Sequence, residues 1–192
     1  DYYIKTKRYD DAVKYLKSAL LKNIKKNTRA RTMFILGQIY EYQGENAKAT
    51  EQFKSVIRKH PGYEMTFESQ MNLAKCHDSK DTSDIMKMFW RMLKDTKNTE
   101  YKDRIFYVMS DVELKKHNEE LGIKYLRKSV ATSTSNNKQK VKSSLKVASM
   151  LFDNKDYVLS QAYYDTVVMT MDRSYPEYDS LLNLSVMLSD LV

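Results

Sequence analysis

The chain has 192 residues, of which 42% are hydrophobic and 30% are charged, and its net charge at neutral pH is +8. This hydrophobic content is sufficient for a buried core, so the composition excludes a wholly disordered chain. Only two prolines and four glycines are present, whereas lysine, glutamate, leucine, alanine and methionine, all of them strong helix formers, are abundant. We therefore expect an all-α fold.

Simple counts exclude two further features: a membrane-spanning helix, and a disulfide or metal site that needs several cysteines. No apolar run approaches the ~18 residues that a membrane-spanning helix needs. Cys76 is the only cysteine, so we expect no intrachain disulfide and no cysteine-rich metal site. The sequence begins at Asp1 without an initiator methionine or the apolar segment of a signal peptide, and we interpret it as part of a longer protein.

The positive charge is concentrated at the start of the chain. Residues 1–31 contain ten Lys and Arg against three Asp, a balance of +7, which leaves +1 for the remaining 161 residues. The basic patch that we single out consists of Lys22, Lys25, Lys26 and Arg29. Such a patch would suit nucleic acid, anionic lipid or an acidic partner, and a solvated helix surface is an equal alternative.

The first clear pair of helices is predicted between residues 29 and 61. Apolar residues in residues 29–42 recur at spacings of three and four, which predicts a helix that ends at Gly44. A second helix follows, and Pro61 prevents it from continuing. Its apolar face is formed by Ala47, Ala49, Phe53, Val56 and Ile57.

Gly37 and Ala49 are the small residues of this pair. Because Gly37 has no Cβ, it would let the second helix cross close to the first, while Tyr40 and Phe53 fill the space around the crossing. Leu-Gly, Tyr, Ala, Phe and Pro at these offsets resemble the tetratricopeptide repeat. That resemblance implies a stack of helix pairs that binds other proteins.

The same pattern recurs along the chain in three columns of equivalent positions. The bulky position of the second helix advances in steps of 37, 37, 36 and 38 residues through Leu16, Phe53, Trp90, Leu126 and Tyr164. The small position of the second helix advances in the same steps through Ala12, Ala49, Met86, Gly122 and Ser160. The small position of the first helix is occupied by Gly37, Ala74, Ser110 and Ala148. Three columns that keep one register predict a repeat architecture.

We therefore predict an all-α tetratricopeptide helical-repeat solenoid of about ten antiparallel helices in a right-handed superhelix. Residues 1–192 would form a single array. Its units are a partial repeat at 1–27, repeats at about 28–62, 63–98, 99–136 and 137–174, and a terminal helix at 175–192. The period exceeds the usual 34 or so residues, which predicts longer connections, most clearly in the polar segment 132–137. We expect the apolar terminal helix to be covered by another chain, either a partner or a second copy of this one.

No enzyme, metal or cofactor motif is apparent. His60, His77 and His117 are far apart in the sequence, and each lies near a predicted helix end. The chain has no glycine-rich phosphate loop, no nucleophile elbow and no HExxH motif. Trp90 and Tyr164 belong to the bulky column, so we expect core packing rather than base stacking. The prediction is a protein without catalytic residues, metal or cofactor.

Projection of the repeat onto the chain gives candidate residues for a concave groove lined by first helices. They are Arg31, Phe34, Gln38, Glu41, Met71, Lys75, Arg104, Tyr107, Asp111, Lys142 and Phe152. Aromatic residues and charges of both signs suit a peptide or protein surface better than a phosphate backbone, which would require a continuous basic track. We therefore expect protein partners and no nucleic acid.

Three segments carry a narrower resemblance: LKDTKNTEYKDRIFY at 93–107, LRKSVATSTSNNKQK at 126–140 and AYYDT at 162–166. They are similar to the tetratricopeptide lipoproteins of Bacteroidetes associated with type IX secretion and gliding motility, the SprE/PorW family. This resemblance implies a periplasmic scaffold that is anchored to the outer membrane by a lipid on residues outside this sequence. It also implies partners among the secretion components.

Two alternatives remain open from the sequence. A cytoplasmic regulator could bind a signalling peptide through its repeats, or nucleic acid through its basic start. An enzyme could carry its catalytic domain outside these 192 residues. The leading hypothesis is the interaction scaffold, which binds through its concave groove or through the basic patch.

Overall fold

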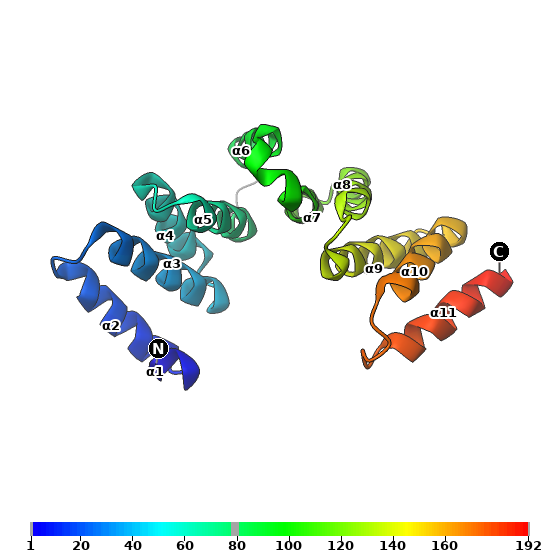
Figure 1. The fold of residues 1–192 in the computed structure, drawn as a ribbon, viewed down its shortest axis with the longest axis horizontal. Helices are drawn as coiled ribbons and strands as arrows, with labels where there is room; N and C mark the ends of the chain where they lie inside the picture. Colours follow the sequence, from blue (N-terminus) through cyan, green and yellow to red (C-terminus); the bar gives the residue numbers. More distant parts are fainter. Residues whose placement is uncertain (1, 78–80, 192) are drawn as a thin grey trace. The chain divides into compact units, whose positions relative to one another are not determined.

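The computed structural model describes residues 2–77 and 81–191, and these residues form eleven α-helices and one 3₁₀ helix without a strand (Figure 1). The predicted all-α class is therefore confirmed. The chain divides into two compact units, Asp1–Thr82 and Ser83–Val192, and each is described by itself. The single array and the right-handed superhelix stay predictions.

In the first unit, consecutive helices pack against one another. They are α1 (Tyr2–Lys5), α2 (Tyr9–Leu21), α3 (Lys26–Tyr42), α4 (Asn46–Lys59) and α5 (Tyr63–Cys76). The α3–α4 hairpin is the pair predicted from the LG, Tyr, Ala, Phe and Pro pattern, and α4 in turn packs against α5. The two first helices α3 and α5 also contact each other. This contact creates a face made only of first helices.

The second unit repeats the arrangement. Its elements are α6 (Ser83–Lys94), the 3₁₀ helix η1 (Thr96–Tyr101), α7 (Lys102–Lys115), α8 (Glu119–Thr132), α9 (Asn137–Asp153), α10 (Tyr157–Thr170) and α11 (Tyr178–Leu191). The α7–α8 and α9–α10 pairs are hairpins, α8 packs on α9, and α10 packs on α11. The first helices α7 and α9 contact each other as α3 and α5 do.

One turn geometry recurs where a first helix gives way to a second. Lys7, Gly44, His117 and Lys155 all have left-handed backbones, with φ of 57°, 75°, 60° and 62°. After each of them a backbone N–H reaches back across the helix end, as in the 2.8 Å bond from Glu45 N to Tyr40 O. This is the turn that often closes a helix around a glycine. Only one of the four positions is occupied by glycine, so the other three side chains are held in an unfavourable conformation.

The predicted small column of the first helices is confirmed. Gly37, Ala74, Ser110 and Ala148 are all buried. A Cβ built on Gly37 would lie 2.7 Å from Phe53 Cε1, so the close crossing of α3 and α4 depends on the missing side chain. In the second helices, the bulky-column residues Phe53, Leu126 and Tyr164 are buried as expected.

Trp90 and Met86 are exceptions, and their predicted core positions are wrong. Trp90 is 42% exposed, whereas its neighbour Phe89 is fully buried. Likewise Ile85 is buried in place of Met86, which is only half-buried. Both columns are displaced by one residue in α6. Because successive residues of an α-helix are rotated by about 100°, a displacement of one residue turns the indole from the core toward solvent.

The predicted connection at 132–137 is shorter than expected. Thr132 is the last residue of α8 and Asn137 the first residue of α9, so only residues 133–136 connect them. Asn136, the last residue of the connection, is the N-cap of α9: its side chain accepts a hydrogen bond from Gln139 N at 3.2 Å.

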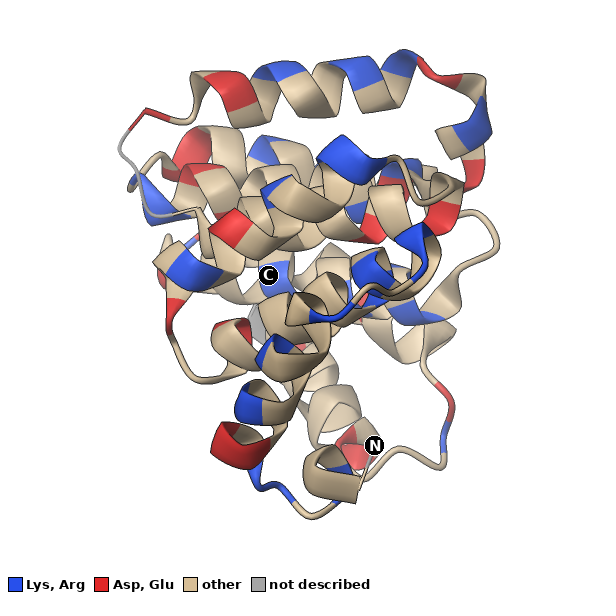
Figure 2. Cartoon of the chain, turned by 90° about the vertical axis from the view of Figure 1, so that its left-hand side faces the viewer, with Lys and Arg blue, Asp and Glu red and all other residues tan. Residues whose placement is uncertain are grey.

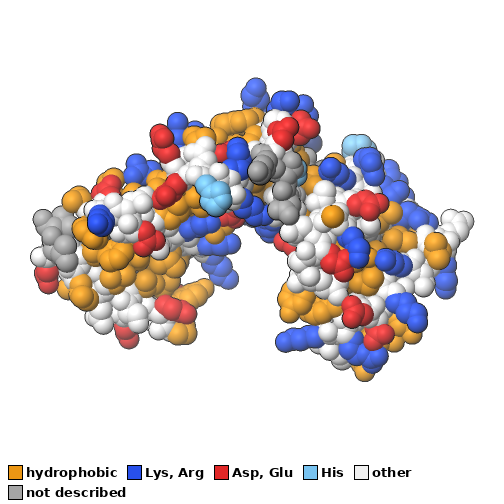
Figure 3. Space-filling model, turned by 180° about the vertical axis from the view of Figure 1, so that it is seen from behind, with side chains coloured by type: hydrophobic (Ala, Val, Ile, Leu, Met, Phe, Trp, Pro, Cys, Tyr) orange, Lys and Arg blue, Asp and Glu red, His pale blue; other side chains and the backbone are white. Residues whose placement is uncertain are grey.

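The terminal helix α11 packs on α10 through Leu181, Leu184 and Leu188. Its other side carries exposed Leu182, Val186 and Met187. Figure 3 shows hydrophobic side chains gathered at the end of the molecule that carries α11. The expected covering of this helix by another chain stays a prediction.

Candidate functional site

Three of the predicted groove residues meet in one pocket of the first unit. Arg31, Phe34 and Gln38 lie on α3 at spacings of three and four, which places them on one face of the helix. They face the start of α5, where Glu64, Met65 and Glu68 complete a pocket of about 300 Å³. The contact between the first helices α3 and α5 therefore creates the pocket.

The pocket combines an apolar floor with a charged rim. Phe34, Ile35 and Met65 are half-buried, and Arg31 and Glu64 are exposed. The Phe34 ring lies edge-on to the buried Phe53 ring, with 5.8 Å between the centroids, so its orientation is fixed by the core. A side chain of a bound peptide could rest on this floor while its backbone and neighbours contact the rim.

Further along the predicted groove of the first unit, the residues differ in role. Met71 is only 2% exposed and belongs to the core, so its prediction as a surface residue is wrong. Lys75 is exposed and its Nζ donates to Asn72 Oδ1 at 3.0 Å. Glu41 is half-buried, one turn beyond Gln38 on α3. The pocket therefore marks the accessible part of this face.

In the second unit, Tyr107, Asp111 and Lys142 come together where α7 contacts α9. Lys142 Nζ lies 4.3 Å and Lys146 Nζ 5.3 Å from the centroid of the Tyr107 ring. Lys146 Nζ also donates to Asp111 Oδ1 at 2.5 Å, which joins the two helices. Burial, and to a lesser extent the negative charge of Asp111, raises the pKa of Tyr107 to about 12.

Arg104 and Phe152 make aromatic contacts of their own. The Arg104 guanidinium carbon is 6.0 Å from the centroid of the Tyr101 ring at the start of α7. The Phe152 ring lies edge-on to Tyr157, with 5.4 Å between the centroids, at the turn between α9 and α10. The predicted groove residues of this unit therefore take part in several local contacts.

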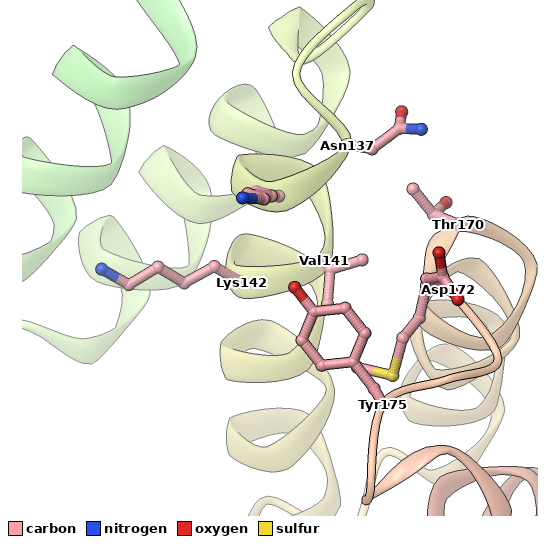
Figure 4. Close-up of a pocket in the computed structure, with 8 residues that line it drawn as sticks. Asn137, Val141, Lys142, Thr170, Asp172 and Tyr175 are labelled. Atoms are coloured by element: carbon pink, nitrogen blue, oxygen red, sulfur yellow. The ribbon is translucent and has the colours of Figure 1, made fainter.

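A larger pocket that the sequence did not indicate lies between the start of α9 and the connection from α10 to α11. Its volume is about 540 Å³, and its lining consists of Asn137, Lys138, Val141, Lys142, Thr170, Met171, Asp172 and Tyr175. Figure 4 shows Lys142 extending away from Asp172, in agreement with its contact to Tyr107. The Ser174 backbone N–H donates to Asp172 at 2.9 Å and lowers the pKa of this carboxyl group.

Of these lining residues, sequence reasoning named only Lys142. Met171, Asp172 and Tyr175 belong to an irregular connection, to which helical periodicity assigns no face. The predicted boundary between the repeat at 137–174 and the terminal helix at 175–192 was the only signal in this segment. The pocket depends on how the connection packs against α9, and residue spacing in the sequence does not predict this packing.

Comparison with known proteins supports the repeat assignment. A family model described as "Tetratricopeptide repeat" matches residues 31–63, which include most of α3 and all of α4. The fold is a tetratricopeptide-repeat solenoid. No curated protein matches the chain. The matched repeat also supplies the α3 side of the pocket that contains Phe34.

The basic patch is only partly a surface feature. Lys22, Lys25 and Lys26 are exposed. Arg29 is half-buried, and its guanidinium donates to Leu20 O at 2.8 Å and to Lys22 O at 2.9 Å. It therefore satisfies carbonyl groups at the end of α2, a structural role that also suits a cation next to the negative end of a helix.

The histidines of the repeats lie at helix ends, as predicted. His60 follows α4, His77 follows α5, and His117 lies in the turn after α7. Within residues 2–77 and 81–191, no three His, Cys, Asp or Glu side chains are grouped as a metal site would require. In the same part of the chain, no helix is both long and apolar enough to cross a membrane.

Proposed function

We propose that this tetratricopeptide-repeat protein is a non-catalytic scaffold that binds segments of other proteins on the face formed by its first helices. Repeats of this kind generally mediate protein–protein interactions. The observation that supports the site is the meeting of Arg31, Phe34 and Gln38 with the start of α5 in one pocket.

The chemistry of the pocket favours a peptide segment with one apolar side chain. The half-buried floor of Phe34, Ile35 and Met65 offers apolar contact area. Arg31 and Glu64 on the rim can pair with charges of either sign, or with backbone groups of the segment. Because Phe34 is held by the buried Phe53, the floor is preorganised and little side-chain entropy is lost on binding.

We further propose that the protein acts in the periplasm, anchored to the outer membrane by a lipid outside this sequence, and supports type IX secretion and gliding motility. The support for this part is the sequence similarity of residues 93–107, 126–140 and 162–166 to lipoproteins of that system. Its partners would then be secretion components. A cytoplasmic regulator that binds a signalling peptide is the competing hypothesis.

Site-specific cross-linking in the native host would test both parts. A photoreactive amino acid replaces Gln38 in the pocket of the full-length protein, and in a matched control it replaces Lys54, which is exposed on α4. We expect cross-links to periplasmic or outer-membrane secretion components from position 38 and few from position 54. Equal capture at both positions would contradict the pocket. Capture of cytoplasmic proteins alone would contradict the periplasmic assignment and favour the regulator.

A further inference from the structure

Trp90 lies on the surface of the second unit, although the repeat pattern assigns it to the core. Its indole ring is supported by Tyr125 of α8, with 6.4 Å between the ring centroids in an edge-on arrangement. Tyr125 in turn stacks on Phe106 of α7, also at 6.4 Å. Both supporting rings are buried, whereas Trp90 is 42% exposed. The indole is thus a fixed, partly open aromatic surface.

Lys128 adds a cation to this cluster. Its Nζ lies 6.0 Å from the centroid of the Trp90 ring and 5.4 Å from that of Phe106. Both distances are within the range of cation–π attraction. The ammonium group therefore lies beside the exposed indole.

Exposed basic residues lie on both helices that contribute to this cluster, α6 and α8. In α6, Lys87 and Lys94 are exposed and share the face of Trp90, because they are separated from it by three and four residues, and the exposed Arg91 follows it directly. In α8, Lys124, Arg127 and Lys128 are exposed. The acidic residues of these helices are confined to their first turns, at Asp84, Glu119 and Glu120.

Figure 2 shows this distribution on α6, the uppermost helix in that view, with an acidic residue near its start and basic residues along the rest. Among these groups, Lys87 Nζ lies 3.6 Å from Asp84 Oδ1 in an ion pair between two well-exposed side chains. Such a pair contributes little at the surface and leaves the patch basic. We call Trp90 with the six basic residues of α6 and α8 the Trp90 surface.

We propose that the Trp90 surface is a docking site for an acidic segment of a partner protein, with one apolar side chain of that segment resting on the indole. An exposed tryptophan supported by buried rings, surrounded by charges of one sign, is the arrangement expected of a binding hot spot with a complementary charged rim. The site lies in Ser83–Val192, whereas the pocket of the proposed function lies in Asp1–Thr82. An experiment can therefore contradict one of the two proposed binding sites without contradicting the other.

An acidic protein segment fits this surface better than a nucleic acid does. Proteins that bind single strands stack successive bases on several exposed rings. Here only Trp90 is exposed, because Tyr125 and Phe106 are buried beneath it. One aromatic anchor with six exposed cations on its two helices matches a segment in which acidic residues flank a single apolar side chain.

The fluorescence of Trp90 provides a direct test, because it is the only tryptophan of the chain. The probe is a short synthetic peptide of glutamates interrupted by one leucine. We expect a saturable change in Trp90 emission that weakens as salt is added. The same peptide with lysine in place of glutamate should produce no change. A response to thymidylate oligonucleotide without a response to the acidic peptide would overturn the proposal in favour of nucleic acid.

Charge-reversal variants distinguish binding at the Trp90 surface from a general attraction between the basic protein and the acidic peptide. The triple variant Lys87→Glu, Arg91→Glu and Lys94→Glu should weaken peptide binding by about tenfold or more. Its matched control, Lys22→Glu, Lys25→Glu and Lys26→Glu, has the same change in charge in the first unit and should weaken binding by less than about threefold. Equal weakening in both would overturn the site. Circular dichroism and thermal melting would establish that each variant folds.

The leucine of the probe is tested separately. Replacing it with glycine removes the side chain that we place on the indole, and should weaken binding by about tenfold, as expected for one buried leucine side chain. An unchanged affinity would overturn the apolar contact with Trp90. The variant Gln38→Glu, which changes the pocket of the first unit, should leave the titration of Trp90 unchanged.

Discussion

Gly37 of α3 lies directly against the ring of Phe53 of α4. A Cβ on Gly37 would come within 2.7 Å of Phe53 Cε1 and 2.9 Å of Cζ. The ring has no room to withdraw, because Phe53 is fully buried and Phe34 lies edge-on to it. The close approach of α3 and α4 at this crossing therefore depends on the absence of one methyl group.

The substitution Gly37→Ala is expected to destabilise the fold. Overpacking a rigid site costs about 1–3 kcal/mol, and the better helix propensity of alanine returns about 1 kcal/mol, so we expect a net loss of about 1 kcal/mol. Urea unfolding would measure it. In the double variant with Phe53→Leu, the two losses should be less than additive, because the smaller side chain makes room for the methyl group. Full additivity would contradict the contact.

At the left-handed turn after α9, we predict a substitution that stabilises the fold. Lys155 has a φ of 62°, where a side chain is unfavourable and glycine is not. Lys155→Gly should therefore raise the free energy of unfolding by about 0.5–1 kcal/mol. The matched control is Gly44→Ala at the equivalent turn, where φ is 75°, and it should be destabilising. If Lys155→Gly lowers the stability, the left-handed conformation is not the controlling factor there.

Ser129 joins three helices in the core of the second unit. Its hydroxyl donates to Asp103 O at 2.7 Å and lies 2.7 Å from Ser143 Oγ. Ser129→Ala leaves Asp103 O without this bond in a buried place, and should cost about 1–3 kcal/mol in urea unfolding. Ser149→Ala, at an exposed position of α9, is the control and should change the stability by less than about 0.5 kcal/mol. A Ser129→Ala variant as stable as this control would show that the bond contributes nothing.

The raised pKa of Tyr107 makes the second unit sensitive to high pH. The phenol ionises at about pH 10 in an unfolded chain, but its pKa is about 12 in the folded protein, first because it is buried and then because Asp111 is near. Between these two values the unfolded state loses the proton that the folded state keeps. Stability is therefore unaffected by this group below about pH 10 and falls as the pH rises toward 12.

Spectroscopic titration can isolate this tyrosine among the 15 of the chain. Subtracting the near-ultraviolet phenolate titration of Tyr107→Phe from that of the unchanged protein should leave one step with a midpoint near pH 12. The variant should also lose less stability than the unchanged protein between pH 10 and 12. A difference step near the ordinary pKa would contradict the burial of Tyr107 between α7 and α9.

Much of the repeat could be predicted from spacing alone. Gly37, Ala74, Ser110 and Ala148 are separated by similar intervals, and all four are buried. Such a column exists because each helix pair must bury one face against its neighbours, so the same small side chain is needed once in every repeat. The end of α3 at Gly44 was equally predictable, because glycine readily adopts the left-handed conformation that closes a helix.

The pocket of the first unit was predictable in part for the same reason. Helical spacing places Arg31, Phe34 and Gln38 on one face of α3, and the repeat pattern turns this face toward the next first helix. Spacing did not show that Met71 would be covered. Whether a side chain at the edge of a helical face is open or buried depends on how closely the neighbouring helix approaches.

The sequence by itself determined the helical class, the repeat and the face of each well-matched helix, because these follow from local propensity and a period that the chain repeats. Only the tertiary structure decided which of Phe89 and Trp90 enters the core. Adjacent residues of a helix point about 100° apart, so both rings were compatible with an apolar face, and tertiary packing buried Phe89 rather than Trp90. The contact of Tyr107 with Lys142 was likewise decided by the approach of α9 to α7 across 35 residues of chain, for which no local pattern exists.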